Sequence, residues 1–153
     1  MTEPFNVFGD EWESVIERPG GTFHDTPVLP RFDGQLLGGS LYELPPHAKG
    51  WPYHFQHANE ELLIVLAGTP TLRDPDGERT LAPGDCVLFP RGPEGAHTVH
   101  NQADEPARFI MFSTLISPEM VSYPDSGKLA ARSDFGRGVF REDSIVDYWE
   151  GEE

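Results

Sequence analysis

Two histidines, a glutamate and a glutamine are the side chains in this sequence best suited to bind a metal ion together. His54 and Gln56 are two residues apart, Glu61 follows five residues after Gln56, and His97 begins a separate segment, HTVHNQ. Imidazole nitrogens with a carboxylate oxygen suit Fe, Mn, Ni, Co or Zn, and a glutamine carbonyl oxygen is a weaker and harder donor. We therefore expect a divalent transition metal at His54, Gln56, Glu61 and His97, if the chain folds these segments together.

Short β-strands are the elements that would position these side chains. The chain contains 16 Gly and 15 Pro, which divide it into short apolar runs typical of an all-β protein. The run ELLIVLAG (61–68) predicts a buried strand, and Asp76-Gly77 predicts a hairpin between two further strands. Alternate residues of a strand point to the same face, so His54 and Gln56 can both point inward. The pattern predicts a sandwich or barrel with the donors at its open end.

Two stretches of the chain resemble the sequence motifs of the cupin superfamily. The first motif has two histidines spaced H-x-H, then a glutamate, then a glycine after six residues; Glu61 and Gly68 fit its second half. His54 takes the first histidine place, and Gln56 stands where the second histidine is usual. The second motif is matched, with two extra residues before the histidine, by Gly84, Pro90, Gly92, His97 and Asn101. The resemblance covers residues 35–114 and implies a small bacterial single-domain cupin with an all-β, double-stranded β-helix (jelly-roll) barrel.

Gln56 departs from the cupin pattern and leaves alternatives open. Either Gln56 binds the metal or a water on it, or a shift of the strand by one residue brings His57 to the site. The shifted register would put Phe55 in the place of the first histidine. We prefer the first alternative, with His57 pointing outward. A metal-free cluster, in which the histidines and the glutamate are joined by hydrogen bonds, is a further interpretation of the same residues.

Charge and composition argue against several classes of partner. The chain has 11 Lys and Arg against 26 Asp and Glu, a formal net charge of −15. So acidic a surface repels phosphate backbones and anionic lipids, and we expect no nucleic-acid or membrane partner. The N-terminus lacks a signal peptide, and no apolar run approaches the roughly 20 residues of a membrane span, so a cytoplasmic protein is expected. The single cysteine, Cys86, excludes an intrachain disulfide and is expected to be buried.

The chain divides into three parts around the expected barrel. Residues 1–34 are polar and interrupted by Gly and Pro, which predicts an N-terminal arm or edge strands. Residues 35–116 form the barrel. Residues 117–153 carry isolated aromatics and many charges, which predicts an irregular C-terminal tail packed on the barrel or on a partner subunit, with a helical turn at SPEMV (117–121). Because cupin barrels expose sheet edges, a homodimer is expected.

Two functions of different classes are compatible with these features. The first is a metal-dependent enzyme that acts on a small organic molecule, since isomerase, lyase and dioxygenase reactions all occur on the cupin scaffold. The second is a non-catalytic protein that binds or senses a small ligand, such as a sugar or a carboxylic acid, in the same pocket. A transition metal that is lost in His97→Ala would favour the enzyme. A metal-free site that still binds a metabolite would favour the binding protein.

Overall fold

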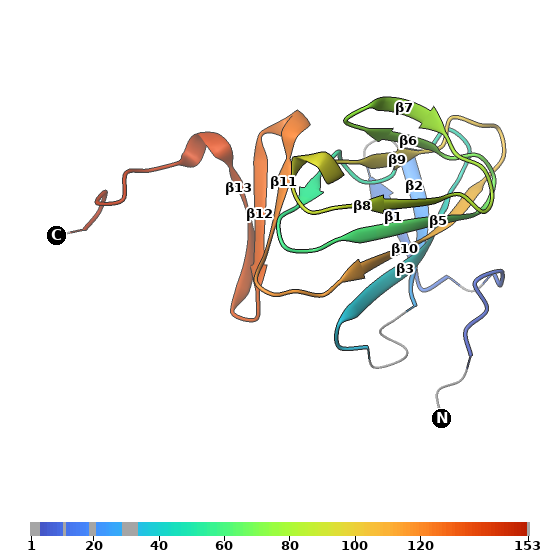
Figure 1. Cartoon of the computed structure of the whole chain (residues 1–153), viewed down its shortest axis with the longest axis horizontal. Coiled ribbons are helices and arrows are strands. Elements are labelled where there is room, and N and C mark those ends of the chain that lie inside the picture. The colour runs from blue at the N-terminus through green and yellow to red at the C-terminus, as the bar shows by residue number, and fades with distance from the viewer. Residues whose placement is uncertain (1–3, 11, 19–20, 29–33, 153) are drawn as a thin grey trace.

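The computed structural model describes residues 4–10, 12–18, 21–28 and 34–152, and it is almost entirely β-structure (Figure 1). The strands are β1 (Ser14–Arg18), β2 (Gly21–Pro27), β3 (Leu37–Leu44), β4 (Phe55–Gln56), β5 (Glu61–Ala67), β6 (Thr71–Asp74), β7 (Gly77–Thr80), β8 (Cys86–Phe89), β9 (Thr98–His100), β10 (Ala107–Thr114), β11 (Glu119–Tyr123), β12 (Lys128–Ser133) and β13 (Gly136–Arg141). Short 3₁₀ turns are η2 (Pro93–Gly95), η3 (Pro124–Ser126) and η4 (Glu142–Ser144). The expected all-β class is confirmed. Among the described residues, no helix has the length and hydropathy needed to cross a membrane.

The strands form three antiparallel sheets around one main core. The largest sheet has the order β1-β2-β3-β10-β5-β8, the second β13-β12-β11-β4 and the third β7-β6-β9. Side chains from the first and third sheets meet in the core, where Leu63, Leu72, Val99 and Phe109 are all 0% exposed. These sheets form a rigid frame for the loops and short strands that carry the candidate ligands.

Strand β5 shows how the sequence positions a functional side chain. Leu63 and Val65 point into the core and are at most 1% exposed. Glu61 is in phase with them at the start of the strand, so its carboxylate also points inward. The intervening Ile64 and Leu66 pack on the opposite face of the sheet against a second apolar cluster. A strand buried on both faces accounts for the continuous apolar run in the sequence.

The N-terminal segment covers the outer face of the large sheet. Phe5, Val7 and Trp12 pack against the second apolar cluster, and β1 and β2 extend the sheet at its edge. Arg108 of β10 fastens this segment, because its guanidinium contacts Asp10 at 3.0 Å and lies over the Trp12 ring at 5.0 Å.

Two tight connections follow the sequence motifs. The predicted hairpin is present, with Asp74 of β6 paired to Gly77 of β7. Gly68 ends β5 with φ of +71°, and a side chain there would overlap the carbonyl oxygen of Pro106. Only glycine fits this turn without strain, which accounts for its place in the first motif.

The C-terminal segment differs from the prediction. The helical turn expected at 117–121 is wrong, because residues 119–123 form β11, which pairs with β12 on one side and with β4 on the other. The expected irregular tail is also wrong for residues 119–141, and irregular chain begins only after β13. One of the two partners of β11 is Phe55–Gln56, far away in the sequence. Pairing over that distance leaves no local periodicity that could be recognised.

Cys86 is also placed differently from the prediction, since it is exposed. Strand β8 lies at the edge of the large sheet. Its alternation places Phe89 in the core at 4% exposure and turns Leu88, which is 59% exposed, outward. Cys86 shares the outward face with Leu88.

Candidate metal centre

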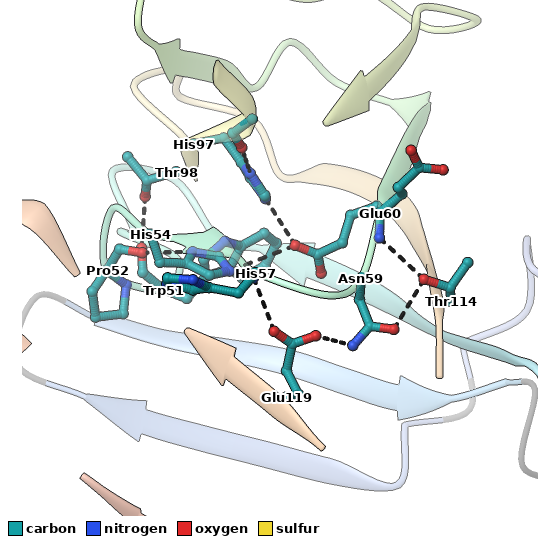
Figure 2. A network of polar contacts seen from close by, with 12 residues as sticks. Trp51, Pro52, His54, His57, Asn59, Glu60, His97, Thr98, Thr114 and Glu119 are labelled. Atoms are coloured by element: carbon teal, nitrogen blue, oxygen red, sulfur yellow. Dashed lines mark hydrogen bonds and ion pairs between the residues drawn. The ribbon is translucent and has the colours of Figure 1, made fainter. Parts of the chain in front are cut away.

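Three of the four predicted ligands converge on one point (Figure 2). The donor atoms of His54, Glu61 and His97 all lie within 4.8 Å of one another. Nε2 of His54 and Nε2 of His97 each lie 3.6 Å from Oε2 of Glu61. Ligand atoms placed about 2.1 Å from a common ion lie about 3–4 Å apart, so these separations suit a shared cation.

Backbone pairing brings the two distant histidines together. The amide of His54 donates to the carbonyl of His97 at 3.1 Å, and the amide of His97 donates to the carbonyl of His54 at 2.8 Å. This antiparallel bridge sets the two imidazole centroids 4.8 Å apart. The loop between β4 and β5 then returns the chain to Glu61, which completes the cluster.

The remaining ring nitrogens are held by backbone carbonyls. Nδ1 of His54 donates to the carbonyl of Pro52 at 3.0 Å, and Nδ1 of His97 donates to the carbonyl of Gly95 at 2.9 Å. With the proton on Nδ1, each imidazole presents the lone pair of Nε2 to Glu61. Hydrogen bonds of this kind orient metal-binding histidines. Gly95 is essential to this geometry, because a side chain there would overlap the carbonyl oxygen of Pro90.

Burial and stacking fix His97 further. The imidazole is 1% exposed and stacks on Phe89, with centroids 3.6 Å apart and planes at 8°. Burial lowers the pKa of His97 to about 4, so the ring is neutral at pH 7. Burial alone would raise the pKa of Glu61, but the neighbouring imidazoles of His54 and His97 outweigh it and lower that pKa. A neutral imidazole beside a carboxylate is the protonation state that metal binding requires.

Gln56 lies beside the cluster, and His57 does not. Gln56 is 8% exposed, and its amide helps to lower the pKa of Glu61 by hydrogen bonding. His57 is exposed, and its Nε2 lies 2.9 Å from Oγ of Ser122, away from the converging donors. The register that would have brought His57 inward is therefore not the one in the structure.

The hydrogen-bond partners of the inward-facing atoms indicate whether these residues fit a metal ion. Nε2 of His97, Oε2 of Glu61 and Oε1 of Gln56 are buried and have no hydrogen-bond partner among the described residues. Burying acceptors without partners is costly. Lone pairs of two imidazoles and a carboxylate that face one another need a cation or extra protons between them. The residues present therefore fit a divalent transition metal.

A buried polar network that the sequence did not reveal holds the loop before Glu61 (Figure 2). Glu119 of β11 accepts hydrogen bonds from the amides of His57 at 3.0 Å and Ala58 at 3.1 Å, and from Nδ2 of Asn59. Oδ1 of Asn59 accepts from Oγ1 of Thr114 at 2.9 Å. Asn59 and Glu119 are each 1% exposed. No local signal links residue 119 to residue 59, so only the structure identifies this support.

The lining of the large cavity includes none of the three converging donors, but it includes two aromatic residues that contact the histidines. Trp51 lies edge-on to His54 and His97, with centroid distances of 6.5 and 6.4 Å, and Tyr123 stacks on His54 at 5.9 Å. Trp51 and Tyr123 also line a cavity of about 1190 Å³. That volume suits a small organic molecule.

Comparison with known proteins agrees with this architecture. The family model for the cupin domain matches residues 40–113. A sugar phosphate isomerase of the cupin superfamily from Silicibacter pomeroyi is 24% identical, with a TM-score of 0.82 over 97% of this chain and 98% of the other. A protein from Acidithiobacillus ferrooxidans, named provisionally as a sugar phosphate isomerase, is 25% identical, with a TM-score of 0.77 over 84% of this chain and 82% of the other.

A third structure extends the comparison to a different activity. The polyketide cyclase RemF from Streptomyces resistomycificus is 22% identical, with a TM-score of 0.60 over 78% of this chain and 84% of the other. No curated protein matches the chain at significant similarity. The family match and the fold shared with these structures confirm the resemblance carried by the two motifs: the chain has a double-stranded β-helix fold, and its residues 40–113 form a cupin domain.

Proposed function

We propose that this cupin is a metal-dependent enzyme that acts on a small anionic organic molecule. The observation that carries the proposal is the convergence of the donor atoms of His54, Glu61 and His97 on one point, where Nε2 of His97 and Oε2 of Glu61 are buried without a hydrogen-bond partner among the described residues. These three residues would hold the metal, and Gln56 would be a weaker fourth ligand. A bound divalent metal supplies a Lewis acid that polarises a carbonyl group. The chain's own residues supply the binding and orientation that determine the substrate.

The charge of the cavity supports an anionic substrate. Its lining includes Arg18, Lys49, Arg73 and Lys128, four of the eleven Lys and Arg in the chain, and only two of the 26 Asp and Glu. Arg73 is engaged by Asp125, with nitrogen–oxygen distances of 2.6 and 2.9 Å. Among the described residues, Lys49 and Lys128 form no ion pair. A concentration of cations in so acidic a protein favours phosphate or carboxylate ligands.

The cavity walls can orient a substrate beside the metal centre. Lys128 lies over the ring of Tyr123, with its Nζ 5.4 Å from the centroid, and Tyr123 in turn stacks on His54. Burial raises the pKa of Tyr123, so its hydroxyl stays protonated at pH 7 and can donate a hydrogen bond. Trp51 covers the two imidazoles from the other direction and limits the access of water to them. An anionic group held at the lysines would therefore leave the rest of the molecule near the metal.

Among isomerase, lyase and dioxygenase reactions, we place isomerisation of a phosphorylated sugar first. Two proteins that share the fold carry names of that activity, and a cationic cavity suits a phosphate group. The polarised carbonyl of an open-chain sugar makes the neighbouring C–H bond more acidic, which is the requirement of such an isomerisation. Loss of that proton from one carbon and uptake of a proton from solvent at the neighbouring carbon leave the oxidation state of the whole molecule unchanged, so no redox partner is needed.

The test of metal binding is the metal content of protein purified without a chelator and without a metal-affinity tag. We expect about one transition metal per chain by elemental mass spectrometry, with His97→Ala losing most of it. His57→Ala is the matched control, because His57 is exposed and points away from the cluster. A wild-type protein that takes up no metal after incubation with Mn, Fe, Co, Ni and Zn would contradict the proposal, as would equal loss in both variants.

The substrate class is tested by calorimetric binding of a hexose 6-phosphate and of the same hexose without phosphate. The phosphate ester should bind more tightly, and Lys49→Ala with Lys128→Ala should weaken that binding by roughly tenfold or more. Arg79→Ala is the control, since Arg79 pairs with Asp74 and lies outside the cavity lining. Isomerisation would appear by NMR in D₂O as deuterium at the carbon beside the carbonyl. Binding without deuterium exchange or turnover would identify a binding protein. Equal affinity for both sugars would refute the proposal that the substrate is anionic.

A further inference from the structure

The chain beyond β13 exposes an unusual amount of apolar surface for its length. Ile145 is 85% exposed, Val146 63%, Tyr148 83% and Trp149 71%. Among the described residues, the hydrogen bonds within 147–152 stay inside this segment, and Tyr148 contacts Trp149 edge-to-face, with centroids 4.9 Å apart. Figure 1 shows this segment leading away from the barrel to the C-terminus. Four large apolar side chains in eight residues are typical of a surface that another protein covers.

A groove on the sheet of β11, β12 and β13 is suited to receive such side chains. It has a volume of about 690 Å³. Ala131 and Gly138 are paired in the register of β12 and β13, and both line the groove with little side-chain bulk. Met120, Phe135 and Phe140 line it and are 41%, 100% and 56% exposed. The groove is therefore apolar and large enough for an aromatic side chain.

Charge distinguishes the groove from the tail. Arg132 and Arg137 line the groove and lie opposite each other in the register of β12 and β13. The tail from residue 142 onward, EDSIVDYWEGEE, contains no Lys or Arg and carries six carboxylates. An acidic, aromatic segment and a basic, apolar groove are complementary in both charge and polarity.

We propose that the tail of a second copy of this chain docks in the groove, with Tyr148 and Trp149 against its apolar floor and the acidic residues beside Arg132 and Arg137. The tail leads away from the molecule that carries it, so a second copy can supply it. Each copy has one tail and one groove, and reciprocal docking gives a closed two-fold dimer. This inference is independent of the metal centre and of the proposed reaction.

The test is sedimentation velocity of the full chain at micromolar concentrations. The wild type should be a dimer. The tail variant is Tyr148→Ala with Trp149→Ala, and the groove variant is Ala131→Glu. In each variant, the dissociation constant of the dimer should be about tenfold higher than in the wild type, or more. Leu36→Ala is the control, because Leu36 is 77% exposed but lies outside the groove and tail, and it should remain dimeric.

Mixing the two variants separates loss of docking from loss of folding. The tail variant keeps a native groove and the groove variant keeps a native tail, so an equimolar mixture should form heterodimers through one intact contact. A monomeric wild type would overturn the proposal. Dimers of wild-type strength in both variants would overturn it too, as would a mixture that stays monomeric while each variant keeps the circular dichroism spectrum and the thermal unfolding midpoint of the wild type.

Discussion

Asn59 and Glu119 are each 1% exposed and are joined by a hydrogen bond from Nδ2 of Asn59 to Oε2 of Glu119. The pair connects the loop that precedes Glu61 to strand β11 of the C-terminal segment. The other carboxylate oxygen of Glu119 accepts the amides of His57 and Ala58. A buried side chain from the C-terminal segment thus fixes the backbone from which a candidate ligand projects.

Removal of this carboxylate should destabilise the protein. In Glu119→Ala, the amide of Ala58 loses its acceptor, and the amide of His57 and Nδ2 of Asn59 each keep only the second of two acceptors. We therefore expect the free energy of unfolding to fall by about 2 kcal/mol in urea titrations. Glu60→Ala is the control, because the Glu60 side chain is exposed and its loss should change stability by less than about 0.5 kcal/mol. Equal effects of the two substitutions would show that the network contributes nothing.

A histidine at position 56 should strengthen metal binding. Imidazole is a better ligand than an amide oxygen for these ions, so Gln56→His should lower the dissociation constant for Co²⁺ or Ni²⁺ on the order of tenfold or more, measured by competition with a chromophoric chelator. Glu60→His is the control, because it adds an imidazole at the exposed position directly before Glu61. It should not tighten metal binding. An unchanged affinity in Gln56→His would mean that residue 56 does not reach the metal.

Stability of the metal-free protein should depend on pH through His97. Its pKa falls from 6.5 to about 4 on folding, so between these values the unfolded chain binds a proton that the folded chain does not. The free energy of unfolding should therefore decrease as the pH falls from 6.5 to 4, by on the order of 3 kcal/mol. His97→Gln cannot take up this proton, and its denaturation curves in chelator should lose correspondingly less stability over the same range. Parallel curves for the two proteins would contradict the lowered pKa.

Local patterns in the sequence were sufficient to predict the barrel strands that hold the site. The run from Glu61 to Ala67 is a strand as predicted, because its apolar residues contact neighbours on both faces. The turn at Asp76-Gly77 was equally recognisable, since its residue types favour one local geometry. The resemblance to the two cupin motifs implied that His54, Glu61 and His97 converge, and the structure shows this convergence.

Features that depend on distant pairing were not predictable in this way. Glu119 gave no signal, because its partner Asn59 is 60 residues earlier in the chain and neither residue lies in a recognisable pattern. Strand β11 was mistaken for a helical turn because it is held by β4 and β12 rather than by its own periodicity. The two carbonyls that orient the imidazoles belong to Pro52 and Gly95, and backbone atoms leave no trace in residue types.

The most direct test of the metal centre is a crystal structure of the metal-loaded protein with anomalous diffraction collected at the absorption edge of the bound element. We expect one anomalous peak per chain, about 2.0–2.3 Å from Nε2 of His54, Nε2 of His97 and a carboxylate oxygen of Glu61. A peak at any other residues, or no peak in protein shown to contain a full equivalent of metal, would contradict this expectation.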